Sequence, residues 1–535
     1  MVIRIILILI FFTCKAYSKT ECSNFAFNQF AGFEKKNKIE KINVQINKKE
    51  TFFKRASRYY VAVNSKGTNR HKNAPKYLKQ YKKKFKAKII LEASNGKNCS
   101  LAATIRGHGD RKDHFDLKNG VPISSYRIKL EEGNINHITR FILFLPKSRN
   151  FDNEIFISTF LKELGFLSPR TFKVKVKINN VESEYIFQEN LKKEFLEDNS
   201  RVEGPILEAN EDLSNFNKLS LARISNKEWI KGIDQNYNIS IHSLRKFNFH
   251  RLNGFSFRIQ SLDFKNSEGL AIDEVLRFDK KNLEYTEANT IGTFQAFMYA
   301  LDASHALSYD DSRFYYDPIY STIEPIYYDG DTRIMSILNY DPYKGKFVKN
   351  LENWKRVKDI NLDFEGFEDK SFKYNLSNQV VSVLAKENAK KAIDMLSKLD
   401  KSKLLSKLQK NGLTYLNKKQ LDELLNFVSL RLVEISNSKV AETLSFEGNT
   451  YKRYENKMNL KSNSKLVFLE NLDLKKNVKN IKVTICDNKL INCNEQLIDE
   501  NKFIDLLEQN NLGDGEHFFL AMKKKYYELY NNEKI

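Results

Sequence analysis

Two acidic positions and the segment between them have the clearest capacity for chemistry in this sequence. Asp302 follows an apolar stretch, and Asp329 stands 27 positions later in the sequence Tyr-Tyr-Asp-Gly-Asp. Paired carboxylates in one cleft are what metal-assisted phosphoryl transfer requires, because one orients the attacking hydroxyl while the other holds metal against the phosphates. The alternative is turn chemistry, since aspartates beside strands commonly cap backbone amides.

The elements around these two residues are expected to bring them together. Apolar residues recur at separations of three and four from Ile291 to Leu301, which predicts a helix that ends beside Asp302. The aromatic and β-branched runs 314–316 and 326–328 are separated by a turn, which predicts two short paired strands. A hairpin between the acidic positions would return the chain to its starting point, so both carboxylates would share one cleft.

Size and charge restrict the class of protein. A chain of 535 residues exceeds the size of a single hydrophobic core, so two or three domains are expected, and a hydrophobic share of 41% indicates a globular protein. The net charge of +22 is compatible with affinity for nucleic acid, anionic lipid or an acidic substrate. The lysines are spread over most segments, and the densest run is 76–88. This diffuse pattern favours a solvated surface over the clustered stripe of a nucleic-acid-binding protein.

The first 18 residues are expected to be a signal peptide. Arg4 precedes the apolar run Ile5–Phe12, and Ala16-Tyr17-Ser18 offers the small residues that signal peptidase accepts. The run is shorter than the roughly 20 residues needed to span a bilayer, and no later segment is long enough, so no transmembrane segment is expected after its removal. The sequence therefore predicts export to the periplasm or the extracellular space.

Four cysteines remain after the predicted signal peptide: Cys22, Cys99, Cys486 and Cys493. An even number in an exported protein predicts disulfides. The simplest pairing joins Cys22 to Cys99, and Cys486 to Cys493 across a short loop.

The segment from residue 87 to residue 209 alternates between strands and helices. A hairpin over 87–106 turns at Asn95-Gly96 and leads into Arg106-Gly107-His108-Gly109, whose glycines would let the backbone approach a phosphate. The strand 124–130 places Arg127 and Lys129 on one face. A strand-borne lysine holds the α- and β-phosphates in kinases, whereas the alternative is a solvated face of an edge strand.

Further elements follow in order. These are a strand at 141–145, a helix from Asp152 to Gly165, an alternating hairpin over 172–189, a helix from Lys192 and a strand at 206–209. Upstream, Tyr59–Val63 is strand-like. Beyond the central segment, helices are predicted within 380–399 and 404–435, and short strands follow residue 444.

The order of these motifs resembles the CotH-type spore-coat protein kinases over roughly residues 87–335. The resemblance rests on RGHG, SYRIKL, DNEIFISTFLKELGFLSPRTFKVKVKINNVESEYIFQENLKKEFL and the segment 294–331. It implies an α+β, atypical protein-kinase-like two-lobed domain over 87–440, with an N-lobe to about 210 and a C-lobe from 211. A basic N-terminal segment (19–86) would precede it and a small β-rich C-terminal appendage (441–535) would follow.

The resemblance also implies roles for single residues. Asp302 corresponds to the catalytic aspartate and His305 to the histidine after it, and Asp329 corresponds to the metal aspartate, with Asp331 beside it as a further candidate ligand. Lys129 corresponds to the nucleotide lysine. The remaining expected nucleotide-site residues are Arg106 and Glu189. ATP and Mg²⁺ or Mn²⁺ are the implied cofactors.

One position departs from the family pattern. Family members usually have Asn before the first hairpin strand, and this chain offers Ser308, Asp310, Asp311 and Ser312. Asp310 or Asp311 could bind a metal in place of the Asn.

Three functions are compatible with these observations. The leading hypothesis is an exported kinase that phosphorylates Ser or Thr of a secreted or envelope protein. The second is a catalytically degenerate module of the cell envelope whose basic surface contacts an anionic polymer, which the absent Asn favours. The third is a metal-dependent hydrolase that uses Asp302, His305 and Asp329.

Overall fold

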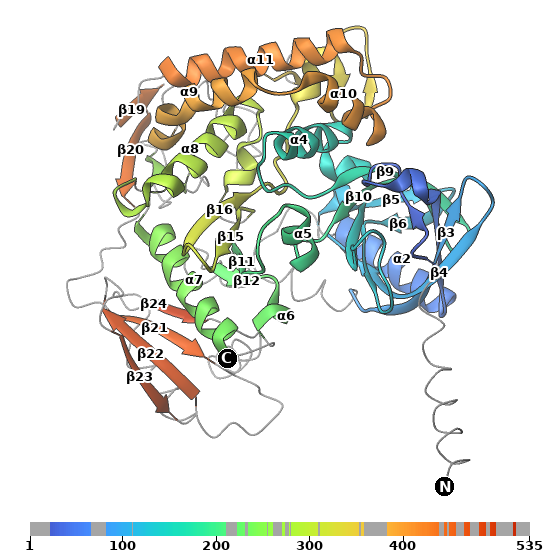
Figure 1. Ribbon diagram of the computed structural model, residues 1–535, viewed down its shortest axis with the longest axis horizontal. Helices are drawn as coiled ribbons and strands as arrows, with labels where there is room; N and C mark the ends of the chain where they lie inside the picture. Colours follow the sequence, from blue (N-terminus) through green and yellow to red (C-terminus); the bar gives the residue numbers. More distant parts are fainter. Residues whose placement is uncertain are drawn as a thin grey trace.

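The computed structural model is a mixed α+β protein in which a barrel-like sheet and a group of helices flank a smaller sheet (Figure 1). The structure describes residues 22–65, 82–109, 111–209, 222–230, 234–253, 255–260, 270–272, 278, 280–308, 311–352, 355–357, 382–437, 443–446, 449–455, 465–470, 481–487, 493–498 and 517–520. The predicted signal peptide lies outside these residues. No helix among them is long and apolar enough to cross a bilayer.

Seven strands form the barrel in the order β2-β3-β4-β7-β8-β10-β9, and a parallel pairing of β9 with β2 closes it. The other neighbours are antiparallel. Their bounds are β2 (Asn37–Ile46), β3 (Phe85–Ala93), β4 (Asn98–Gly107), β7 (Tyr126–Leu130), β8 (Arg140–Phe144), β9 (Thr171–Ile178) and β10 (Val181–Glu189). The short β1 (Phe25–Ala26) pairs with β2. Along the chain, β4 and β7 are connected by a segment that contains a separate hairpin of β5 (Phe115–Lys118) and β6 (Val121–Ser124).

Strict alternation of apolar residues builds the barrel interior, as strands with one buried face require. On β7, Tyr126, Ile128 and Leu130 join the interior core, so Arg127 and Lys129 face outward. The predicted hairpin at Asn95-Gly96 is confirmed, because β3 and β4 pair across it and Gly96 has a φ of 78°.

The N-terminal segment is part of this barrel. It contributes β1, β2 and the start of β3, and the expected disulfide between Cys22 and Cys99 ties it to β4. The strand predicted at Tyr59–Val63 is wrong, because these residues end the helix α2 (Lys49–Ser65). In that helix Tyr59, Ala62 and Val63 share one face and pack against Phe115.

A smaller sheet of order β12-β11-β15-β16 carries the predicted hairpin. Its strands are β11 (Ile206–Ala209), β12 (Ala222–Ile224), β15 (Arg313–Asp317) and β16 (Thr322–Ile326). Short helices α5 (Lys193–Asp198) and α6 (Lys227–Ile230) and the longer α7 (Asp234–Asn253) connect these strands to the rest of the chain.

The helices pack around α8, which carries the chain into Asp302. Their bounds are α4 (Asp152–Glu163), α8 (Tyr285–Ala300), α9 (Val383–Ser397), α10 (Lys401–Lys410) and α11 (Lys418–Asn437). The apolar faces of all five meet in one core, which α4 links to the barrel strand β8. A capping box between Glu284 and Glu287 begins α8 and fixes its start. The described residues also contain six 3₁₀ turns: Phe33–Lys35, Lys112–His114, Pro146–Arg149, Lys280–Asn282, Ser304–Leu307 and Ile334–Leu338.

Short strands after residue 440 form two further sheets. One has the order β14-β13-β20-β19 and joins β13 (Phe255–Gln260) and β14 (Leu270–Ile272) to β19 (Thr443–Phe446) and β20 (Asn449–Glu455), so it spans the boundary expected at residue 440. The other has the order β23-β22-β21-β24, with β21 (Lys465–Glu470), β22 (Ile481–Asp487), β23 (Cys493–Ile498) and β24 (His517–Leu520). Cys486 and Cys493 are direct register partners in it. The small pair β17 (Tyr340–Asp341) and β18 (Lys346–Phe347) follows the last 3₁₀ turn.

Candidate functional site

The chain turns sharply at both ends of the β15–β16 hairpin, and the two turns meet. Asp302, Asp329 and Asp331 have φ values of 55°, 49° and 51°, a backbone region that Asp adopts more readily than most residues. The Thr332 hydroxyl donates a 2.6 Å hydrogen bond to the Leu301 carbonyl. The structure therefore brings the segment at 302 next to the segment at 329–331.

A histidine and two aspartates converge where these turns meet. His305 lies in the 3₁₀ turn Ser304–Leu307, and its Nε2 is 3.0 Å from Oδ2 of Asp311. One ligand atom from each of His305, Asp311 and Asp329 lies within 4.8 Å of the other two. The side chains of Asp311 and Asp329 are 19% and 23% exposed, so solvent reaches the group. This spacing could hold one metal ion.

Arg149 is the cation beside this group. It ends a 3₁₀ turn after β8, and its Nη1 is 2.7 Å from Oδ2 of Asp329. The guanidinium stacks 4.0 Å above the Phe144 ring and donates to the Tyr328 hydroxyl at 3.3 Å, so it is held on three sides. Burial alone would lower the pKa of Arg149, but the Asp329 charge raises it above its usual range.

The pKa values of the two aspartates are shifted in opposite directions. Burial raises the pKa of Asp329 above its ordinary value, against the opposing charge of Arg149, and the Asp311 charge adds to the rise. For Asp311, burial also favours the protonated form, but the hydrogen bond from His305 and its charge hold the pKa below the ordinary value. Asp311 is thus the carboxylate of the group that stays ionised at lower pH.

The other expected acidic residues have separate partners. The Asp302 carboxylate lies 3.2 Å from Nε of Arg333, and Asp331 accepts a 2.6 Å hydrogen bond from the Asn150 amide. Asp310 lies outside the described residues. Asp302 and Asp331 therefore border the group of His305, Asp311 and Asp329 without being part of it.

The residues expected at the nucleotide lie on the barrel. Lys129 is exposed on the outer face of β7, and Arg106 stands opposite Arg127 in the register of β4 and β7. Glu189 is buried and accepts hydrogen bonds from the side chain and the backbone amide of Arg170 at 2.6 to 2.8 Å. The structure gives Glu189 a structural ion pair and leaves Lys129 in solvent.

Sequence reasoning did not assign Arg127 to the site, although it placed Arg127 on the same face of β7 as Lys129. Arg127 interacts electrostatically with Tyr328 and with Glu208 of β11, so it faces the smaller sheet. The alternating pattern does mark it as outward-facing, and this was the available signal.

No family model matches the chain, and no curated protein shows significant sequence similarity to it.

A second missed residue is Glu154, which lies buried in the first turn of α4. Its carboxylate accepts a 2.6 Å hydrogen bond from the Tyr327 hydroxyl and a 2.9 Å hydrogen bond from the Gln188 amide. Burial raises the pKa of Glu154 to about 7, against the charge of Arg149. The Tyr327 hydroxyl also accepts from the Gly330 amide at 3.3 Å, so Glu154 is connected to the turn that carries Asp329.

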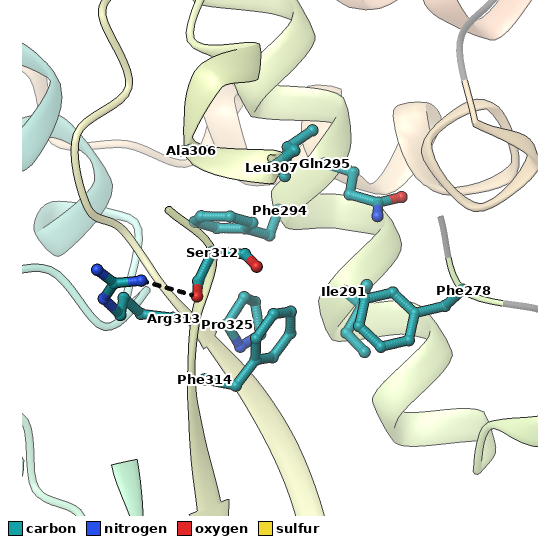
Figure 2. Close-up of a pocket in the computed structure, with 10 residues that line it drawn as sticks. All are labelled: Phe278, Ile291, Phe294, Gln295, Ala306, Leu307, Ser312, Arg313, Phe314 and Pro325. Carbon is teal, nitrogen blue, oxygen red and sulfur yellow. Dashed lines mark hydrogen bonds between the residues drawn. The ribbon is translucent and has the colours of Figure 1, made fainter. Parts of the chain in front are cut away.

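A cavity of about 10 Å³ lies between α8 and the hairpin and has room for about one water molecule. Figure 2 shows apolar side chains on this side of β15, while the guanidinium of Arg313 is directed away from them. The Ser312 hydroxyl, buried here, has no hydrogen-bond partner in the described part of the chain. A cavity of this size is too small for a ligand larger than water.

Proposed function

We propose that this protein is an exported, two-lobed, kinase-like phosphotransferase. It would transfer a phosphoryl group from ATP, with Mg²⁺ or Mn²⁺, to a Ser or Thr hydroxyl of a secreted or envelope protein. The observation that carries the proposal is the convergence of His305, Asp311 and Asp329 within 4.8 Å, next to the turn that presents Asp302. Phosphoryl transfer needs positioning and charge neutralisation more than covalent chemistry, and this arrangement offers both.

The donor set suits a divalent cation. Carboxylate oxygens are preferred by Mg²⁺ and Mn²⁺, whereas the imidazole of His305 suits Mn²⁺ or a later transition metal better than Mg²⁺. We therefore expect tighter binding of Mn²⁺ than of Mg²⁺. When bound, the ion would neutralise phosphate charge.

The chain's own residues would do the positioning. Asp302 is the residue proposed to accept the hydrogen bond of the attacking hydroxyl, and Arg333 fixes its carboxylate. Arg149 sets the orientation of Asp329, because it is buried against Phe144 and cannot move freely.

One observation favours a second function, a non-catalytic binding module of the envelope that contacts an anionic polymer. Asp329, the expected metal ligand, is already neutralised by Arg149 at 2.7 Å. If that pair stays closed, Asp329 is not available to a metal ion and phosphoryl transfer is lost, while the basic surface of a chain with net charge +22 still contacts the polymer.

Labelled ATP separates the two functions. Purified protein is incubated with γ-labelled ATP and Mg²⁺ or Mn²⁺, together with casein as a general acceptor, and incorporation into protein is counted. We expect incorporation with wild type, and loss of about a hundredfold or more with Asp302→Asn or Asp329→Asn, because each removes a group needed in the transition state.

Asp394→Asn is the matched control, since this exposed aspartate lies on α9 and pairs only with Lys398 among the described residues. Mn²⁺ binding is followed in parallel by electron paramagnetic resonance. Wild-type protein that binds neither Mn²⁺ nor ATP would refute the kinase proposal and favour the binding module.

A further inference from the structure

Guanidinium groups gather around the ring of Tyr328, at the junction of the barrel and the smaller sheet. Arg313 lies 4.7 Å and Arg149 5.4 Å from the centre of this ring. Arg127 approaches it from β7. Arg149 is paired with Asp329, whereas Arg313 and Arg127 face Glu208.

That group is built on one carboxylate. Glu208 of β11 is the direct register partner of Arg223 on β12 and of Arg313 on β15, so the three side chains form a row across the sheet. Nε of Arg223 lies 2.8 Å from Oε1 of Glu208, and Nε of Arg313 lies 3.2 Å from Oε2. Each oxygen of the carboxylate is therefore already engaged.

Arg127 is the third cation facing Glu208. Its Nε is buried and has no hydrogen-bond partner among the described residues, and no carboxylate of that part of the chain pairs with it within 4.0 Å. Burial lowers the pKa of Arg127; the charges of Tyr328 and Glu208 oppose this shift, and those of Arg223 and Arg313 add to it. An isolated, partly buried cation is costly unless an anion completes its environment.

The surroundings leave this group open toward a ligand. The side chain of Arg223 is 33% exposed and that of Glu208 is 17% exposed, so solvent reaches the row. Figure 2 shows that the Arg313 guanidinium is turned away from the apolar cavity behind β15. The polar and apolar sides of the strand are thus separated, and the polar side carries the arginines that face Glu208.

We propose that Arg127, Arg223 and Arg313 form a binding site for a phosphate group. The buried Nε of Arg127 has no hydrogen-bond partner among the described residues, and the guanidiniums of Arg223 and Arg313 lie beside Glu208, which Arg127 also faces, so the group offers more donors than one carboxylate uses and matches the oxygens of a phosphate. Arginine offers paired N–H donors that match phosphate oxygens, and Glu208 keeps two of the arginines oriented before the ligand arrives. Phosphate binding at this site does not rest on the proposed function. The proposed function bears only on the source of the phosphate, which is a nucleotide or a phosphorylated acceptor.

Lys129 provides a matched control for Arg127. Both lie on the outer face of β7, two positions apart, and Lys129 is exposed to solvent. Binding is measured by isothermal titration calorimetry in EDTA, so that no metal contributes, with pyrophosphate, ATP, and a phosphoserine peptide beside its unphosphorylated form. The Asp394→Asn variant is included as a control for the loss of one surface carboxylate.

We expect Arg127→Gln to weaken phosphate binding by about tenfold or more, and Lys129→Gln to change it less than about twofold, because one lost charge-assisted hydrogen bond is worth that much. Arg127→Lys should bind with intermediate affinity. Asp394→Asn should bind as wild type does. Because binding is measured in EDTA, without metal or phosphoryl transfer, failure of phosphoryl transfer leaves this result intact.

The ligand series identifies the source of the phosphate. Tighter binding of ATP than of pyrophosphate or the phosphoserine peptide assigns the site to the nucleotide. Binding of the phosphoserine peptide in preference to its unphosphorylated form and to ATP assigns it to a phosphorylated acceptor. No binding of any phosphate ligand by folded wild type, or equal loss in Arg127→Gln and Lys129→Gln, would overturn the proposal.

Discussion

Replacement of Glu154 by Gln tests whether a proton is stored beside the candidate site. The Glu154 side chain is buried and accepts hydrogen bonds from Tyr327 and Gln188. Its carboxyl has a pKa of about 7 in the folded protein, against an ordinary value of 4.5, because burial disfavours the charge. The amide of Gln has the same shape as the protonated carboxyl and cannot ionise.

The sign and size of the effect follow from proton linkage. Between pH 4.5 and 7 the folded state keeps the proton on Glu154 while the unfolded chain loses it, so stability falls as the pH rises. At about 1.4 kcal/mol for each pH unit, the free energy of unfolding falls by about 3 kcal/mol between pH 4.5 and neutral pH. We therefore expect wild type and Glu154→Gln to be about equally stable near pH 4.5, and the variant to be about 3 kcal/mol more stable near pH 8.

Urea unfolding followed by tryptophan fluorescence at several pH values measures this difference. Glu197→Gln is the control, since this glutamate on α5 is exposed and its replacement should leave the pH dependence unchanged. The difference between variant and wild type is the quantity of interest, because other titrating groups cancel in it. A difference that stays constant from pH 5 to pH 8 would show that Glu154 is ionised throughout, and the reasoning would be refuted.

Two further predictions concern stability. Cys22→Ser should lower the free energy of unfolding by about 4 kcal/mol, because the bond to Cys99 closes a loop with a sequence separation of 77; wild type under reducing conditions should show the same loss by urea unfolding. Gly292→Ala should lower the free energy of unfolding by about 1–3 kcal/mol and so lower the melting temperature. Its added Cβ would lie 2.4 Å from the Asn388 amide nitrogen and push α8 away from α9. An unchanged melting temperature would mean that the two helices pack more loosely than described.

Local patterns predicted most elements of the barrel but not its closure. The alternation in 172–178 and 184–189 is strong enough to identify β9 and β10, because apolar side chains on one strand face must all be buried together. Closure depends on a parallel pairing of Lys41–Val44 with Lys175–Ile178. Partners so distant along the chain leave no local signal, so the role of the N-terminal segment was not predictable.

The strand-like run Tyr59–Val63 was misread for a related physical reason. Aromatic and β-branched residues favour strands on average, but five residues cannot separate a period of 2 from a period of 3.6. Packing of Tyr59 and Val63 against Phe115 decided the outcome, and that contact joins residues about 50 positions apart. Tertiary contacts overrode local propensity there.

The candidate site shows the same division between what is local and what is not. The order of the elements along the chain predicted that the segments of Asp302 and Asp329 meet, because a hairpin must return the chain to its start. The sequence could not tell which of Arg127 and Lys129 faces the smaller sheet. Both lie on one face of β7, and only the packing of that sheet against the barrel distinguishes them.

Distant cations also decide the state of the acidic residues. Four carboxylates at the junction have a positively charged or potentially charged partner: Asp302 with Arg333, Asp311 with His305, Asp329 with Arg149, and Glu208 with Arg223 and Arg313. Without these partners the carboxylates would repel one another and take up protons. A divalent ion at the group of His305, Asp311 and Asp329 must therefore compete with Arg149 for Asp329. Anion binding at Arg127 needs no metal ion, and its buried Nε has no hydrogen bond among the described residues that must first be broken, so we expect phosphate affinity to persist under conditions that leave the metal group empty.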